Sequence, residues 1–408
     1  MANAKRIQKD LEALRDISAG SGEGTTRLSY TPAYRKGVEY LKEQMRAFGL
    51  IPHEDGVGNL YGDLMGQNPD APKIISGSHL DTVHCSGYFD GQAGIICALE
   101  AARMLKESGE PLHSTFQVMA TIMEEGARFP SLGGSRFAIG EHTEETMENT
   151  FDMDGVKLGD AIREYGLTGN LEETRRRPED AKAFLELHME QGLKLDQTGT
   201  DLGIVETIYG SRWFILTCHG ATSHPSTPMD IRKDTALAAY KLITNIADIV
   251  ARDYAGKATV TSGKMTLYPN DINAIPSRSQ FSIDFRSGKL EHLDALETLM
   301  REQVRLIEKA YRVRFDIALH SAAPPTDNNP VLSKILEDSA EELGYSHMRM
   351  DSGAGHDAMI FAKIWNIAML FVPSRGGYTH CRQEWTDYEN LAKGADVLYH
   401  AVRKIDKL

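Results

Sequence analysis

A strand, a helix and a second strand follow one another early in the chain, and this succession limits the fold more than any other feature. Lys73–Ser76 is typical of the end of a short buried strand, and Thr115–Met123 has the composition of another strand. Between them, Gly94–Lys106 carries apolar residues at helical spacing. Two strands joined through a helix form a parallel βαβ unit. The sequence therefore predicts an α/β domain built on a sheet.

The middle of the chain has a different succession of predicted elements. It follows the order strand, helix, strand, strand, helix, strand, which is that of a ferredoxin-like α+β module. The elements are strands at Arg212–His219, around Ala258–Tyr268, at Gln280–Arg286 and near Arg314–His320, and helices at Lys233–Tyr254 and Leu290–Tyr311. Helix and strand then alternate again. We therefore expect one α/β domain, residues 1–208 and 321–408, interrupted by an inserted α+β domain at 209–320.

The charge and the cysteines exclude several classes of protein. The 408 residues carry a formal net charge of −13 and have a pI near 5.6, which argues against nucleic acid or an anionic membrane surface as the main partner. The four cysteines form no CxxC pair, so a thiolate zinc finger is not expected. No apolar run has the length of a membrane span, and no secretory signal is seen. We expect a cytoplasmic enzyme with reduced thiols.

Acidic and imidazole side chains recur where four predicted strands end. Open α/β sheets place their ligand sites beyond the carboxyl ends of strands. The residues are His79 and Asp81 after the first strand, Asp90 in a glycine-flanked turn beyond it, Glu124 and Glu125 after the second strand, His188 at the end of Ala183–Met189, and His380 after Ile367–Val372. Carboxylates and imidazoles without thiolates suit zinc, manganese or cobalt. Each residue alone is more often a surface or core histidine, a turn aspartate or a surface glutamate, so the shared position is what predicts a metal site.

Several motifs at and beyond these positions resemble one enzyme family over nearly the whole chain. They are HLDTV from His79, FDG from Phe89, EEGARF from Glu124, ELHMEQG from Glu186, SGAGHDA from Ser352 and FVPSRGGYTH from Phe371. Together they resemble the metal-dependent amidohydrolases of the aminoacylase/carboxypeptidase G superfamily. Within it, they are most similar to the ureido branch, which includes allantoate amidohydrolase, N-carbamoyl-L-amino-acid hydrolase and β-ureidopropionase. The resemblance implies a zinc-peptidase-like catalytic domain with an inserted lid and dimerisation domain.

The resemblance implies a centre of two divalent metal ions per subunit. Asp90 would bridge the two metals, His79 and His188 would complete one side, and Glu125 and His380 the other. Zinc is the expected metal, with manganese, cobalt or nickel as alternatives. Two metals about 3.5 Å apart can polarise a carbonyl and activate water.

Two further acids receive other roles in this family. Asp81 would orient His79, since a carboxylate behind a metal-bound imidazole fixes its direction. Glu124 would be the general base, which moves protons instead of holding metal.

The inserted domain would carry substrate contacts and form a homodimer with a second copy. His224 would stabilise the oxyanion, reaching across from the partner subunit, while Asn273 and Arg286 would hold a substrate carboxylate. Arginine suits this task because its charge is permanent and its geometry is bidentate. Gln191 and His356 would lie near the ureido end of the substrate.

Two stretches depart from the family pattern. The segment His224–Met229 is one residue shorter than usual and contains Pro225, which fixes φ and removes a backbone donor. At the start of the insertion, Ser211-Arg212 lacks the glutamine that allantoate amidohydrolases tend to carry beside this arginine. SGAGHDA, in contrast, favours an allantoate amidohydrolase.

We expect hydrolysis of the ureido C–N bond of an N-carbamoyl acid with a free carboxylate, with release of ammonia, CO2 and the free amine compound. One alternative is allantoate as the specific substrate. Another is an N-acyl amino acid hydrolase or a dipeptidase of the same superfamily. A non-catalytic binding protein that has kept the fold is disfavoured, because Glu124 and every predicted metal ligand are present.

Overall fold

The chain forms two compact units in the computed structural model, which describes residues 1–19 and 24–408. The first unit consists of residues 1–206, 328–352 and 356–408, and the second of residues 207–327 with 353–355. The predicted insertion ends at residue 320, whereas the last long strand of the second unit, β11 (Arg314–Ala323), continues past it.

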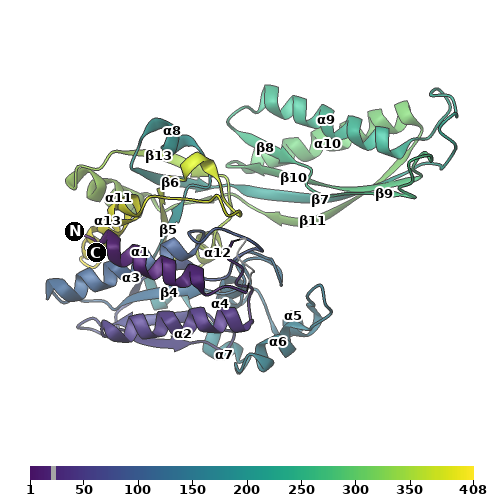
Figure 1. The fold of residues 1–408 in the computed structure, drawn as a ribbon. Helices are drawn as coiled ribbons and strands as arrows, with labels where there is room; N and C mark the ends of the chain where they lie inside the picture. The colour runs from purple at the N-terminus through teal and green to yellow at the C-terminus, as the bar shows by residue number, and fades with distance from the viewer. Residues whose placement is uncertain (20–23) are drawn as a thin grey trace. The chain divides into compact units, whose positions relative to one another are not determined.

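The first unit is built on a mixed sheet whose central strands are parallel (Figure 1). The order is β1-β2-β4-β3-β5-β14-β6-β12, with β13 also beside β6, and the neighbours among β4, β3, β5 and β14 are parallel. Parallel strands are covered on both faces, which is why β14, IAMLFV, is apolar and buried along its whole length. The strands of this sheet are β1 (Ile51–Glu54), β2 (Leu60–Leu64), β3 (Lys73–His79), β4 (Phe116–Thr121), β5 (Ala181–Met189), β6 (Leu202–Ile208), β13 (His347–Ser352), β14 (Ile367–Val372) and the two-residue strand β12 (Thr326–Asp327), whose residues are counted in the second unit.

Helices pack on the parallel strands of this unit, and the predicted βαβ unit is confirmed as β3–α3–β4. The connecting helix α3 packs on β3, β4 and β5 and against α1 and α13, while α12 contacts β5, β14 and α4. Helix α2 is capped at its start, because the Thr31 hydroxyl accepts a hydrogen bond from the Tyr34 N–H and Pro32 takes the first turn. The helices are α1 (Ala4–Asp16), α2 (Pro32–Ala47), α3 (Gln92–Ser108), α4 (Gly133–Ile139), α5 (Glu144–Asn149), α6 (Leu158–Glu164), α7 (Leu171–Thr174), α8 (Lys194–Thr198), α11 (Pro330–Glu342), α12 (Asp357–Phe361) and α13 (Tyr388–Ile405).

The second unit is an antiparallel sheet with two long helices on one face (Figure 1). Its strand order is β11-β7-β10-β8, with β9 also beside β10. β8 and β9 pair with successive parts of β10. Together they therefore occupy the position of the single strand expected around Ala258–Tyr268. A separate core lies between the sheet and the helices, and it includes Phe214, Leu216, Phe281 and Leu296. The elements besides β11 are β7 (Gly210–His219), α9 (Thr235–Asp253), β8 (Ala258–Thr261), β9 (Met265–Tyr268), β10 (Arg278–Ser287) and α10 (Leu290–Tyr311).

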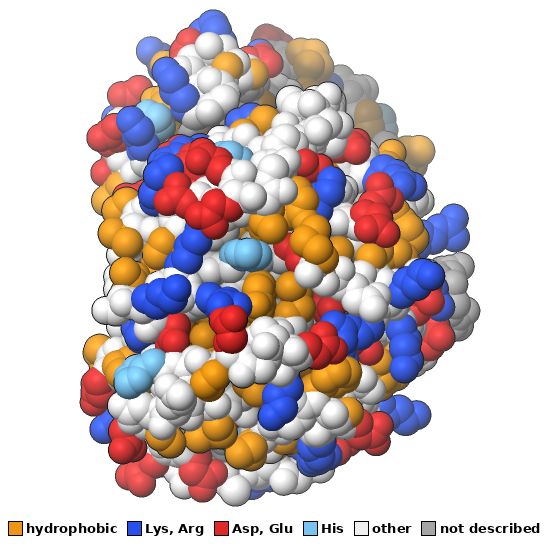
Figure 2. Space-filling model, turned by 90° about the vertical axis from the view of Figure 1, so that its left-hand side faces the viewer, with side chains coloured by type: hydrophobic (Ala, Val, Ile, Leu, Met, Phe, Trp, Pro, Cys, Tyr) orange, Lys and Arg blue, Asp and Glu red, His pale blue; other side chains and the backbone are white. Residues whose placement is uncertain are grey.

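The molecular surface carries charges of both signs. Figure 2 shows acidic and basic side chains interspersed on one face, with apolar side chains between them. Such apolar side chains are normal on protein surfaces. Among the residues that the structure describes, no helix combines the length and the apolar character needed to cross a membrane.

Candidate metal centre

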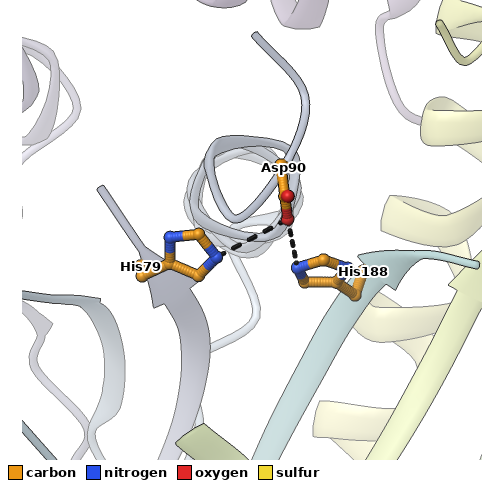
Figure 3. Close-up of side chains that lie close together, drawn as sticks. All are labelled: His79, Asp90 and His188. Atoms are coloured by element: carbon orange, nitrogen blue, oxygen red, sulfur yellow. Dashed lines mark ion pairs between the residues drawn. The ribbon is translucent and has the colours of Figure 1, made fainter. Parts of the chain in front are cut away.

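Two histidines and an aspartate converge at the carboxyl end of the parallel strands. His79 is the last residue of β3 and His188 lies near the end of the neighbouring strand β5, so both reach the same edge of the sheet. Asp90, just before α3, points between them (Figure 3). Its Oδ1 atom lies 3.1 Å from His188 Nε2 and 3.6 Å from His79 Nε2. All three side chains are almost fully buried, at 3 % exposure or less.

A second group forms on the other oxygen of Asp90. Asp90 Oδ2 lies 3.0 Å from His380 Nε2, which in turn is 3.4 Å from Glu125 Oε2. In each group, the three candidate ligand atoms lie within 4.8 Å of one another. One carboxylate that offers one oxygen to each of two ligand groups has the arrangement of a bridging ligand. The structure thus brings together all five residues that the sequence predicts as metal ligands.

A close approach of backbone and imidazole allows Asp90 to reach this position. Gly91 has φ of 67°, and a Cβ atom built on it would lie 2.5 Å from three atoms of the His79 ring. Any other residue here would have both an unfavourable φ and a steric clash. The FDG motif therefore contains glycine because the chain turns directly against a candidate ligand.

The donor atoms of this cluster fit divalent metals. The Nδ1–H groups of His79 and His188 each donate a hydrogen bond of 2.9 Å to a main-chain carbonyl, of Asp81 and Met189 respectively. This bond leaves the Nε2 lone pair directed at the cluster, as in a metal-binding imidazole. Within the described part of the chain, the buried Glu125 Oε1 atom has no hydrogen-bond partner. A buried carboxylate oxygen without a partner is costly, and a bound cation would satisfy it.

The predicted contact between Asp81 and His79 needs a correction. Asp81 holds the imidazole through its main-chain carbonyl and not through its carboxylate. The carboxylate instead accepts hydrogen bonds from the N–H groups of Glu124, at 3.1 Å, and Glu125, at 3.3 Å. These two donors lie just beyond the end of β4, outside the strand pairing that the described residues form. Asp81 therefore fixes both His79 and the two glutamates.

Glu124 lies beside the cluster without joining either ligand group. Its Oε2 atom is 3.7 Å from His79 Nε2, and its side chain is 11 % exposed. Burial raises the pKa of Glu124 well above its ordinary value, despite the opposing effect of His79 and with a further rise from Glu125. A carboxyl group that is easily protonated and close to the ligands has the properties of a proton carrier.

The ligands share protons when no cation is bound. Although burial opposes it, the imidazoles of His188, His380 and His79 hold the pKa of Asp90 well below its ordinary value. Burial and then Asp90 raise the pKa of Glu125 to about 7. The hydrogen bond to Asp90 raises the pKa of His380 to about 9, although burial opposes this. Protons therefore compete with metal at Glu125 and His380.

We expect the affinity for divalent metal to increase by at least roughly 100-fold between pH 6 and pH 8. The sign follows from the two pKa values. His380 is protonated below its pKa of about 9 and Glu125 below its pKa of about 7, and each must lose this proton before it can bind metal. Equilibrium dialysis against buffered zinc, with metal counted by mass spectrometry, would measure this. An affinity that does not change over this range would contradict the expectation.

Two predicted substrate residues lie in the same unit as the cluster. Gln191 has φ of 55° and donates hydrogen bonds from Nε2 to Asp90 Oδ2, at 3.0 Å, and to the Thr379 hydroxyl, at 3.1 Å. In this structure its amide therefore holds the central carboxylate. His356 is buried, its Nε2 atom is 2.9 Å from the Ser352 hydroxyl, and its ring centre is 4.6 Å from that of His188.

The other three predicted substrate residues belong to the second unit. His224 and Asn273 are exposed on loops, and His224 Nδ1 lies 2.7 Å from the Ser226 hydroxyl. Arg286, on β10, is half-buried and pairs with Asp284, two residues earlier on the same face of the strand, at 3.2 Å. Their roles toward substrate stay predictions.

The structure adds Glu384, which the motifs did not indicate. This buried glutamate accepts hydrogen bonds from the backbone at both Asp90 and His380. Its position four residues after His380 was the only signal in the sequence. Such spacing alone does not show that the side chain reaches a loop 294 residues earlier.

Several known proteins are similar to this chain along nearly its whole length. An N-carbamoyl-L-amino-acid amidohydrolase from Paenarthrobacter aurescens is 36 % identical, over 100 % of this chain and 99 % of that protein. An allantoate amidohydrolase from Bacillus subtilis is also 36 % identical, over 97 % and 96 % of the two chains. The crystal structure of an amidase of the hydantoinase/carbamoylase family from Burkholderia multivorans matches with a TM-score of 0.91 at 30 % identity, covering 99 % of this chain and 98 % of that one.

The mixed sheet, with an acid and imidazole cluster at the carboxyl ends of its strands, is that of a metal-dependent hydrolase. The sequence profile of Peptidase family M20/M25/M40 matches residues 69–404, and the chain belongs to this family. The resemblance, the α/β fold class and the hydrolase class expected from the sequence are thereby confirmed.

Proposed function

We propose that this protein hydrolyses the ureido C–N bond of an N-carbamoyl acid that carries a free carboxylate. The observation that carries the proposal is the pair of ligand groups that share Asp90, with Glu124 beside them. The similarity over whole chains to an N-carbamoyl-L-amino-acid amidohydrolase and an allantoate amidohydrolase supports a ureido substrate.

Two divalent metals, zinc first among them, would be held by the five clustered residues. His79 and His188 would hold one ion, Glu125 and His380 the other, and Asp90 both. When bound, such metals polarise the substrate carbonyl and lower the pKa of a water molecule. The main-chain carbonyls behind His79 and His188 keep each Nε2 atom directed at its ion.

Glu124 would move the protons of the reaction. It takes a proton from the attacking water, which adds to the ureido carbonyl. The C–N bond then breaks, and Glu124 returns the proton to the leaving nitrogen. The products are the free amine compound and a carbamate, which decomposes to CO2 and ammonia. The raised pKa of Glu124 suits this exchange, because burial makes its carboxylate a better proton acceptor than an ordinary glutamate.

The second unit would supply the remaining contacts with substrate. In this proposal, Arg286 and Asn273 bind the substrate carboxylate, and His224 stabilises the oxyanion from the partner subunit of a homodimer. Gln191 and His356 act near the ureido end. The four cysteines are free thiols, which supports a cytoplasmic location.

Allantoate is the second candidate substrate. The allantoate amidohydrolase from Bacillus subtilis is as similar to this chain as the carbamoyl-amino-acid enzyme, at 36 % identity. Identity therefore does not separate the two substrates, both of which contain a ureido group and a carboxylate.

A substrate panel on the zinc-loaded enzyme tests the proposal. Ammonia release from N-carbamoyl-L-amino acids, N-carbamoyl-β-alanine and allantoate is compared with amine release from N-acetyl amino acids and dipeptides. We expect turnover of at least one ureido acid, and none when its carboxylate is converted to an amide. Turnover of N-acetyl amino acids or dipeptides alone would refute the proposal.

A further inference from the structure

Two loops that carry candidate ligands of the second metal group come from distant parts of the chain. Asp90 lies in the loop before α3, and His380 in the loop between β14 and α13. No strand pairing joins these two loops in the described part of the chain. Their relative position must therefore depend on side chains.

One carboxylate connects the two loops. Glu384 Oε1 accepts hydrogen bonds from the N–H groups of Phe89, at 2.9 Å, and Asp90, at 3.1 Å. Its Oε2 atom accepts one from the N–H of His380, at 3.2 Å, and lies 3.4 Å from the Thr379 hydroxyl. Glu384 is only 2 % exposed. A buried N–H donor that loses its acceptor is costly, so these bonds constrain both loops.

The surrounding backbone is shaped around this side chain. A Cβ atom built on Gly87 would lie 2.4 Å from Glu384 Cβ and 2.3 Å from its Oε1 atom, so only glycine leaves room for it. His380 has φ of 56°, in the left-handed region that non-glycine residues adopt only where their surroundings hold them. The bond from its N–H to Glu384 is one such restraint.

We propose that Glu384 is a positioning residue that fixes Asp90 and His380 relative to each other and thereby sets the affinity of the Asp90–Glu125–His380 group for its metal. The inference rests on the proposed two-metal function. Glu384 acts through the backbone of two ligands and does not itself bind metal. Among the described residues, no hydrogen bond joins it to His79 or His188, so the first metal should depend on it less.

Glutamine is an informative replacement because it has nearly the same shape. Its amide nitrogen would face N–H donors in either orientation, so at least one loop loses its acceptor while packing is kept. Aspartate keeps both acceptor oxygens but is one methylene shorter. Glu389→Gln, an exposed change on α13, is the matched control for the loss of one charge.

The test counts zinc per chain at graded free zinc, together with the thermal unfolding temperature of each variant. We expect Glu384→Gln to bind its second zinc about 10–100-fold more weakly, to keep the first nearly unchanged, and to recover activity in excess zinc. Glu384→Asp should show a smaller loss, and Glu389→Gln none.

If both zinc affinities of Glu384→Gln equalled those of the unchanged protein, the inference would be overturned and the proposed function would stand. Should Glu384→Gln fail to fold, Glu384→Asp decides, since unchanged affinity in that variant would overturn the inference equally. An unchanged protein that binds no zinc would instead refute the proposed two-metal function.

Discussion

We expect the Glu124→Gln variant to lose about 10²–10⁴-fold in kcat while it keeps both metals, because glutamine cannot take up or return a proton. Glu124 lies 3.7 Å from His79 yet belongs to neither ligand group of the described residues, so the proton-transfer role separates from metal binding. The main-chain N–H of Glu124 bonds to Asp81, and this bond is independent of the side-chain change.

The measurement pairs steady-state kinetics on the best ureido substrate with zinc counts per chain. Glu145→Gln, an exposed change on α5, controls for loss of one negative charge. A Glu124→Gln protein with full activity and two bound zinc ions would rule out the proposed proton carrier. Loss of zinc together with activity would reassign Glu124 as a ligand.

The Asp90→Asn variant should bind less than one zinc ion per chain and lose more than about 100-fold in activity. This exceeds the usual loss for a residue that only supports a ligand, because Asp90 belongs to both candidate groups. The substitution removes a charge that faces three imidazoles, at distances of 3.0 to 3.6 Å. Glu125→Gln, by contrast, should weaken only one of the two metals.

Zinc counts and unfolding temperatures with and without zinc would test this expectation. A ligand that binds only the folded protein raises its unfolding temperature, so zinc should stabilise the unchanged protein and Asp154→Asn, an exposed control. It should not stabilise Asp90→Asn. If Asp90→Asn kept two zinc ions, the bridging role of Asp90 would be wrong.

Much of the fold could be predicted from local sequence patterns. The apolar run of β14, the alternation along β7 and the cap at Thr31 each depend on neighbours within a few residues, so they can be read without knowing the tertiary structure. The strand order and the split of one expected strand into β8 and β9 depend on pairing across the sheet. No local pattern encodes such pairing.

The candidate site shows the same division. His79 and His188 could be placed from sequence because they lie at or next to the ends of strands β3 and β5, and parallel strands end at one edge of a sheet. The direction of the Asp81 carboxylate could not be predicted, because it depends on two N–H groups beyond β4, more than 40 residues later. Gln191 was assigned to substrate, and only the structure revealed its bond to Asp90.

The sequence by itself determined the class of fold, the kind of site and the residue types able to bind metal, since these follow from local periodicity and from motifs with their own chemistry. The tertiary structure alone decided which atoms face which, as Glu384 illustrates. Its carboxylate bonds to residues 294 and 295 positions away and also to one only four away. A buried acceptor binds whichever donors the fold brings to it, and that choice is made only when the whole chain has packed.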